Sequence, residues 1–149
     1  MLNTHINANK KRNNSKGFDK MLKLGLKGKE QAIVSLSKSA KEMGSGSLEV
    51  FATPALVALM EAASVNCLHG LLEQGQTTVG ISINVKHTSP TPLGMTVGAE
   101  SELVEIDGRR LVFKITAYDT AGVIGTATHE RMIVDGAKLL EKAASKSKR

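Results

Sequence analysis

The stretch TPALVALMEAASVNCLHGLL, residues 53–72, is the longest apolar stretch in the chain. Thr53 suits a helix N-cap, Pro54 suits the first helical position, and Gly75 follows as a stop signal. The sequence therefore predicts one long helix. Its apolar residues cover nearly the whole circumference, so we expect it to be buried on most sides.

A membrane span is the obvious alternative for such a helix. The run is barely long enough to cross a bilayer, and three polar residues interrupt it. These residues are Glu61, Asn66 and His69. We therefore expect no membrane partner, and a helix buried in a small domain needs a sheet to wrap around it.

Short runs with alternating apolar and polar residues supply that sheet. We expect strands over residues 32–36, 79–86, 95–103, 111–118 and 123–134. Asp107-Gly108 predicts a type I′ hairpin between two of them. The prediction is an α+β fold, with an antiparallel sheet wrapped around one long central helix and a short polar helix near residues 137–144.

The distribution of charge divides the chain of 149 residues into three parts. The net charge is +6, but residues 1–29 carry +7, residues 138–149 carry +4, and the residues between carry −5. We interpret residues 1–20 as a disordered basic extension, 21–137 as the domain and 138–149 as a basic C-terminal helix or tail. Met21 is a candidate natural start of translation.

Composition also bounds the partners and the compartment. Basic tails around an acidic body, with three Phe, one Tyr and no Trp, argue against a nucleic-acid partner. The single cysteine, Cys67, excludes an internal disulfide and a Cys-based zinc site. We expect no metal and no cofactor. We also expect a cytoplasmic protein, since one free thiol suits a reducing compartment.

Three polar residues stand where the pattern favours apolar ones or a helix start. Glu61 lies inside the apolar helix, where a carboxylate without partners is costly. His87 is in phase with Val79, Ile81, Ile83 and Val85. Thr53, at the helix start, is about 80° and about 12 Å from Glu61, so one packed strand could bring His87 between them. Each also has a structural interpretation: Thr53 as a cap, His87 as a packing residue, and Glu61 as part of a solvated stripe, although the sequence shows no such stripe.

The chain resembles the hotdog-fold thioesterase superfamily, and within it the group that contains fluoroacetyl-CoA thioesterase. Four stretches carry the resemblance, in matching order and spacing. They are GSGSLEVFATPALVALMEAAS (44–64), QTTVGISINVKHTSPTPLGMTV (76–97), EIDGRRLVFKITAYD (105–119) and GVIGTATHERMIV (122–134).

The resemblance implies an acyl-CoA thioesterase in which Thr53, Glu61 and His87 form the catalytic group. It also implies a homodimer, with two sheets joined edge to edge and acyl-CoA held near the interface. The segment 39–50 is closer to general relatives than to the fluoroacetyl-specific enzyme. We therefore expect a general acyl-CoA thioesterase.

We assign three further residues to substrate binding: Phe51, Gly80 and Arg131. Gly80 lies beside the pocket in the family, where a small residue would admit substrate. Arg131 could meet a CoA phosphate or form a structural ion pair.

Two other functions remain as alternatives to the thioesterase. One is a non-catalytic hotdog module that binds acyl-CoA or a related small ligand, although a binder needs no Glu and His pair. The other is a hotdog dehydratase, whose usual arrangement of acid and His is not visible in the sequence.

Overall fold

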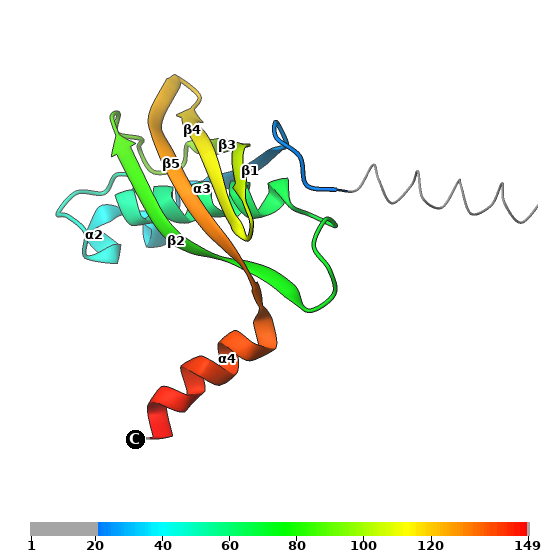
Figure 1. Cartoon of the computed structure of the whole chain (residues 1–149). Coiled ribbons are helices and arrows are strands. Elements are labelled where there is room, and N and C mark those ends of the chain that lie inside the picture. Colours follow the sequence, from blue (N-terminus) through cyan, green and yellow to red (C-terminus); the bar gives the residue numbers. More distant parts are fainter. Residues whose placement is uncertain (1–20, 149) are drawn as a thin grey trace, which may run out of the picture.

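The computed structural model describes residues 21–148, and its main feature is a curled antiparallel sheet with one long helix against a single face (Figure 1). The predicted extension over residues 1–20 lies outside the described residues. The sheet has the order β1-β3-β4-β5-β2, and all its pairs are antiparallel. In chain order the elements are β1 (Lys27–Ile33), η1 (Leu36–Lys38), α2 (Ala40–Met43), α3 (Thr53–Cys67), β2 (Gln76–His87), β3 (Thr96–Asp107), β4 (Arg110–Asp119), β5 (Gly122–Asp135), α4 (Gly136–Ser145) and η2 (Lys146–Lys148).

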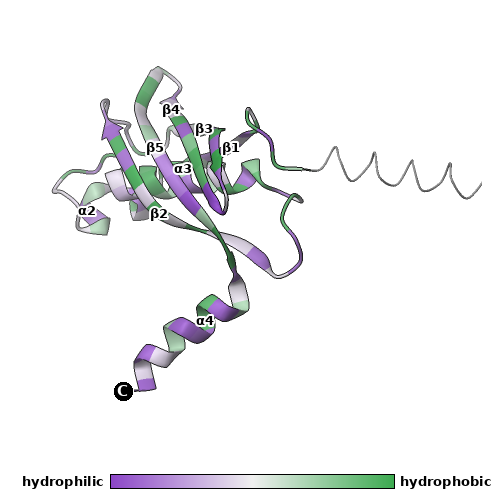
Figure 2. Cartoon of the chain, in the orientation of Figure 1, coloured by the Kyte–Doolittle hydropathy of each residue, from purple (hydrophilic) through white to green (hydrophobic). Residues whose placement is uncertain are grey.

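The core lies between α3 and the inner face of the sheet, as the alternating patterns predict. Hydrophilic and hydrophobic residues alternate along the strands in Figure 2. The buried strand residues include Val97, Ala99, Leu103, Leu111, Phe113 and Ile115. From α3, Leu56, Met60 and Ala63 pack against them. This confirms the predicted α+β architecture.

Helix α3 begins and ends earlier than the sequence predicts. Its N-cap is Ala52, so Thr53 is the first helical residue rather than the cap, and Pro54 is the second. The helix ends at Cys67 instead of near Leu72, because the chain must turn back to start β2. The chain turns at Gly70, which has a positive φ of 74°.

The expectation that α3 is buried on most sides is wrong for the single chain. One five-stranded sheet can cover only one side of a helix, and the other side is left open. Ala58 is exposed, Val57, Glu61 and Ala62 are half-buried, and Val65 is 46% exposed.

Strand β1 also differs from its prediction. It runs from Lys27 to Ile33, so it starts five residues before the predicted strand and stops before Val34 and Leu36. Its residues are mostly polar because it is an edge strand, paired on one side only with β3. An apolar pattern search therefore misses its first half.

The β3–β4 hairpin forms where expected, with a different turn. Asp107 pairs with Arg110, so the two loop residues are Gly108 and Arg109. Gly108 has a φ of 59°, and no residue other than glycine has a positive φ in the described chain. A type I′ turn needs positive φ at both loop positions, so that predicted type is wrong.

A bulge in β2 breaks the alternation that the sequence predicts. Gly80 pairs with Arg131 and Ser82 with Glu130, which leaves Ile81 without a partner in β5. A bulge inserts one extra residue into a strand, so the side chains after it point to the opposite face from those predicted by a regular pattern.

The bulge decides which β2 residues face α3. Before it, Thr78 and Gly80 face inward, and after it Ile83, Val85 and His87 do. His87 therefore shares its face with Ile83 and Val85, as predicted. The expectation that Val79 and Ile81 lie on the same face is wrong, because the extra residue separates them from the later half of the strand.

The last described α-helix, α4, leaves the sheet at the end of β5 (Figure 1). It occupies the region where the sequence predicts a short polar helix. In the described part of the chain, no helix is both long enough and apolar enough to cross a membrane.

The close contact between β1 and α3 makes a first prediction. A Cβ at Gly28 would lie 2.2 Å from the Ala63 carbonyl oxygen and 2.4 Å from the Cys67 nitrogen, both backbone atoms of α3. Gly28→Ala should lower the free energy of unfolding by about 3 kcal/mol, because strand and helix must separate. Urea unfolding would measure this loss.

Gly136→Ala is the matched control, since a Cβ there meets its nearest atom at 3.6 Å, an ordinary contact. The control should leave stability unchanged or slightly raised. Equal stability of the two variants would contradict the packing described for β1 and α3.

Candidate active site

Two groups of polar side chains lie along α3 where it faces β2 and β5. The first, the Thr–His pair, consists of Thr53 and His87. The second, the arginine cluster, consists of Glu61, Thr78, His129 and Arg131. Both groups use α3 and β2, β5 contributes only to the arginine cluster, and no hydrogen bond or ion pair joins the groups among residues 21–148.

The Thr–His pair is held by the start of α3 and the end of β2. Thr53 Oγ1 and His87 Nδ1 are 2.8 Å apart. The Phe51 ring meets the His87 ring edge to face, with centroids 6.3 Å apart. This packing restricts the orientation of the imidazole, and the assignment of Phe51 to substrate binding stays a prediction.

The second nitrogen of His87, Nε2, is buried and has no hydrogen-bond partner in the described chain. Thr53 and His87 both line a pocket of about 300 Å³, and Val50, Phe51 and Ser89 line it too. If Nδ1 donates its proton to Thr53, Nε2 carries a free lone pair. An unpartnered imidazole nitrogen is the arrangement expected of a group that accepts a proton from a bound molecule.

Burial lowers the pKa of His87 below its ordinary value of 6.5, and the backbone of Ser89 opposes the shift only in part. The cationic form is disfavoured because it loses hydration. His87 is therefore neutral at neutral pH, and a neutral imidazole can act as a base.

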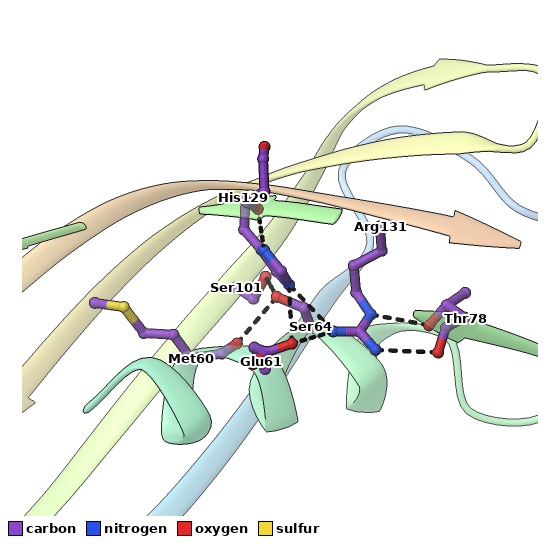
Figure 3. A network of polar contacts seen from close by, with 8 residues as sticks. Met60, Glu61, Ser64, Thr78, Ser101, His129 and Arg131 are labelled. Carbon is purple, nitrogen blue, oxygen red and sulfur yellow. Dashed lines mark hydrogen bonds and ion pairs between the residues drawn. The ribbon is translucent and has the colours of Figure 1, made fainter. Parts of the chain in front are cut away.

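The arginine cluster is built around the Arg131 guanidinium on β5 (Figure 3). Arg131 Nη1 donates to Glu61 Oε2 at 2.9 Å. Nε and Nη2 donate to the hydroxyl and the carbonyl oxygen of Thr78, at 2.9 and 3.1 Å. Three bonds from one planar group hold both the strand and the carboxylate in place.

His129 completes the cluster and has a defined tautomer. Its Nδ1 lies 2.7 Å from the Ser82 carbonyl oxygen, which can only accept, so the proton is on Nδ1. Nε2 then accepts from Arg131 Nη1 at 3.2 Å and lies 3.9 Å from Glu61 Oε2. Arg131 Nη1 thus bridges the imidazole and the carboxylate.

Burial lowers the pKa of His129 below 6.5, and the Arg131 charge adds to this effect, while the Ser82 carbonyl opposes it. A neutral His129 is also what the hydrogen bonds require. Protonation would place a second N–H against the Arg131 guanidinium, so the cluster is built for the neutral ring.

Gly80 lies directly against the cluster. A Cβ at this position would be 2.5 Å from Glu61 Oε2 and 3.3 Å from Arg131 Nη1. The missing side chain therefore leaves room for the Glu61 carboxylate itself, and the assignment of Gly80 to substrate binding stays a prediction.

Of the three predicted catalytic residues, the structure brings together Thr53 and His87 and leaves Glu61 apart. The carboxylate turns instead to Arg131, two turns further along the helix from Thr53. Glu61 is also not buried, since its side chain is 40% exposed. The expectation of a costly buried carboxylate is wrong, because Arg131 compensates its charge and solvent reaches it.

The sequence leaves two roles open for Arg131, contact with a CoA phosphate or a structural ion pair, and the structure contains the ion pair with Glu61. The guanidinium is almost fully buried and all its nitrogens are engaged. Its contact with a CoA phosphate stays a prediction.

His129 and Thr78 are the site residues that the sequence assignment omits. His129 alternates with Arg131 along β5, which is a signal that both point to the helix. No signal marks Thr78, because its inward direction depends on the bulge. No group of three or more metal-binding side chains is placed together within residues 21–148.

Comparison with known proteins gives one consistent result. Residues 34–137 match the family described as FlK, fluoroacetyl-CoA-specific thioesterase. The fluoroacetyl-CoA thioesterase of Streptantibioticus cattleyicolor is 41% identical over 99 residues, which are 66% of this chain and 71% of that protein.

Solved structures agree. A structure of the fluoroacetyl-CoA thioesterase FlK has a TM-score of 0.79 and 34% identity, over 84% of this chain and 97% of that one. A hot-dog-like protein from Thermanaerovibrio acidaminovorans has a TM-score of 0.76 at 24% identity, over 87% and 96%. These similarities confirm the predicted hotdog fold.

The neutral state of His129 leads to a second prediction, which concerns how the free energy of unfolding depends on pH. Its pKa is lower in the folded chain than in the unfolded one, so its contribution to stability is complete above pH 6.5 and is lost as pH falls below that value. The free energy of unfolding should therefore fall below pH 6.5, with a slope of up to about 1.4 kcal/mol per pH unit for this group.

His129→Gln should reduce that slope, because glutamine keeps a donor and an acceptor but does not titrate. The exposed His69 offers the control, and His69→Gln should keep the wild-type slope. Denaturant unfolding between pH 5 and 7.5 measures both. Identical slopes for the two variants would contradict the assignment.

Proposed function

The chain belongs to the fluoroacetyl-CoA-specific thioesterase family and is a thioester hydrolase, and from this premise we propose that it hydrolyses an acyl-CoA to a free acid and CoA at a site made of Thr53, Glu61 and His87. The observation that carries the proposal is the hydrogen bond of Thr53 to Nδ1 of His87, which leaves Nε2 of His87 unpartnered, in two residues that line the same pocket.

In the proposed reaction, His87 Nε2 takes a proton from the attacking water. The water oxygen bonds to the thioester carbonyl carbon, the C–S bond breaks, and the proton passes to the CoA thiolate. Thr53 holds the imidazole in the tautomer that leaves Nε2 free. The N-terminus of α3, with its partial positive charge, favours the negative charge that develops on the carbonyl oxygen.

Glu61 has two roles open to it, and both use its free oxygen. Arg131 donates to Oε2, while Oε1 forms no hydrogen bond in the described chain. Oε1 can orient the water, or it can attack the carbonyl itself to form a mixed anhydride that water then hydrolyses. A single turnover in ¹⁸O-water with enzyme in excess separates these roles. Direct attack by water puts ¹⁸O into the product acid, whereas an anhydride that water opens at the Glu61 carbonyl puts ¹⁸O into Glu61 and leaves the acid unlabelled.

We place the site in a homodimer joined at the β2 edges. Strand β2 is an edge of the sheet, and Ile81 at its bulge is 48% exposed. A long edge with an exposed apolar residue is suited to pairing with a second copy. Two observations support this homodimer: the free edge of β2, and the open face of α3, which a second copy of the chain could also cover.

For the acyl group, we propose only its size class. The pocket at the Thr–His pair has room for a short acyl group, with a volume of about 300 Å³. A general acyl-CoA activity is proposed, and a cytoplasmic location is retained with it. Hydrolysis of acetyl-, haloacetyl-, medium-chain and aryl-acetyl-CoA, followed by release of free thiol, identifies the preferred substrate.

Substitution of the two ionisable residues makes a third prediction. Glu61→Gln and His87→Ala should each lower kcat/KM at least about 100-fold on the preferred acyl-CoA, because each removes a group that handles a proton or the carbonyl. Free-thiol release measures the loss.

Glu73→Gln and His69→Ala make the same chemical changes at exposed positions and should keep wild-type rates. Near wild-type kcat/KM in both Glu61→Gln and His87→Ala would remove the proposed site.

The lowered pKa of His87 makes a fourth prediction. The neutral ring is the active form, and its pKa lies below 6.5. Activity should therefore stay constant as pH falls to 6.5 and decline only below it. The pH profile of kcat/KM measures this limb, and an acidic midpoint above 6.5 would be inconsistent with His87 as the base.

A further inference from the structure

Helix α4 has no packing partner in the described chain. All its residues after Gly136 are exposed, including Leu139 at 37% and Leu140 at 72%. Isolated helices shorter than about 12 residues are marginal in water, and α4 has ten. A short helix that exposes two leucines is expected to be covered by another surface.

The residues of α4 separate into an apolar face and a basic ridge. Leu139, Leu140, Ala143 and Ala144 fall within about 140° of one another at 100° per residue. Lys138 and Lys142 of α4 and Lys146, the C-cap residue at which η2 begins, are spaced four residues apart and form one line beside that face. The mixture of hydrophobic and hydrophilic residues along α4 is visible in Figure 2.

The position of α4 points it toward the free edge of the sheet. Asp135, the residue before α4, pairs with Gln76 at the start of β2, and Gly136 N donates to the Gly75 carbonyl at 3.0 Å. Figure 1 shows α4 leaving the body of the sheet on the side where β2 forms the edge.

Pairing of two β2 edges would bring α4 to the other subunit's pocket. If β2 pairs antiparallel with its copy about its centre, Gln76 of one strand lies opposite the end of the other strand, where that copy's Thr–His pair lies. α4 then starts about 10 Å from that end, two strand spacings away. Its length of about 15 Å is enough to reach across the pocket mouth.

The pocket needs cations that its own chain does not supply. The described residues that line it are all uncharged apart from the titratable His87. Of the nearby lysines, Lys41 pairs with Glu49, Lys38 lines a different pocket, and Lys86 lies on the outer face of the sheet. CoA carries several phosphate charges, and these favour lysines at the binding site.

We propose that α4 docks through its apolar face on a second copy of the chain, and that Lys138, Lys142 and Lys146 bind the phosphates of the CoA held in that copy's pocket. The proposal rests on the thioesterase function and adds its CoA-binding element. Each complete site then contains the Thr–His pair of one subunit and the basic ridge of the other.

The first test is the binding of free CoA, measured by calorimetry on the full chain. Replacement of all three ridge lysines by Ala should weaken Kd for CoA about tenfold or more and should leave pantetheine binding the same as in the wild type. Lys23, Lys27 and Lys114 replaced by Ala remove the same charge from other exposed positions and should keep the wild-type Kd. An unchanged Kd for CoA in the ridge variant would overturn the proposal.

The second test shows which subunit the ridge serves. Chains with His87→Ala are mixed with chains that carry the three ridge substitutions. In a mixed dimer, the intact His87 of the ridge-variant chain meets the intact α4 of its partner. The mixture should therefore contain active sites with the wild-type KM for acyl-CoA, although neither variant has such sites when it is alone.

No restoration in the mixture would mean that the ridge acts on its own subunit or on none, and the proposal would fail. The thioesterase function is tested separately from the role of the basic ridge. If the wild type binds CoA through the ridge but hydrolyses no acyl-CoA, the thioesterase activity fails while the binding element stands. If His87→Ala alone retains activity, the catalytic assignment fails before the mixing test is interpreted.

Discussion

Burial of one side of α3 against one face of the sheet is the constraint on which the rest of the structure depends. The contact is close because Gly28 lets the β1 backbone meet the α3 backbone directly. Since the sheet covers only one side, residues at the margin of the helix face both the sheet and solvent. Thr53 and Glu61 occupy this margin, which makes it the natural place for a site.

The bulge at Ile81 then decides which polar groups meet at that margin. It points Thr78 and Gly80 toward the helix before it and His87 after it. Thr78 anchors Arg131, the absence of a side chain at Gly80 leaves space for the Glu61 carboxylate, and His87 reaches Thr53. Without the extra residue, one half of β2 would face away from α3 and one of the two polar groups would be lost.

The polar groups are stabilised in different ways, which suits their different roles. Arg131 satisfies every nitrogen with a partner, and the neutral His129 accepts one of its protons. His87 keeps one nitrogen buried without a partner. Buried polar atoms are usually satisfied, so the exception marks the atom that a bound molecule would complete.

The sequence is sufficient for the α+β fold, the long helix and the inward residues of β3 and β4, because apolar periodicity and local motifs encode them directly. It also marks Thr53, Glu61 and His87 as candidates, and their catalytic role stays a prediction. It missed the first half of β1, since an edge strand needs no apolar alternation. Only the tertiary structure decided that Glu61 pairs with Arg131, that Thr78 and His129 complete this group, and that α3 has an open side. These features depend on strand register and on a bulge, which arise from contacts between distant residues and leave no local pattern.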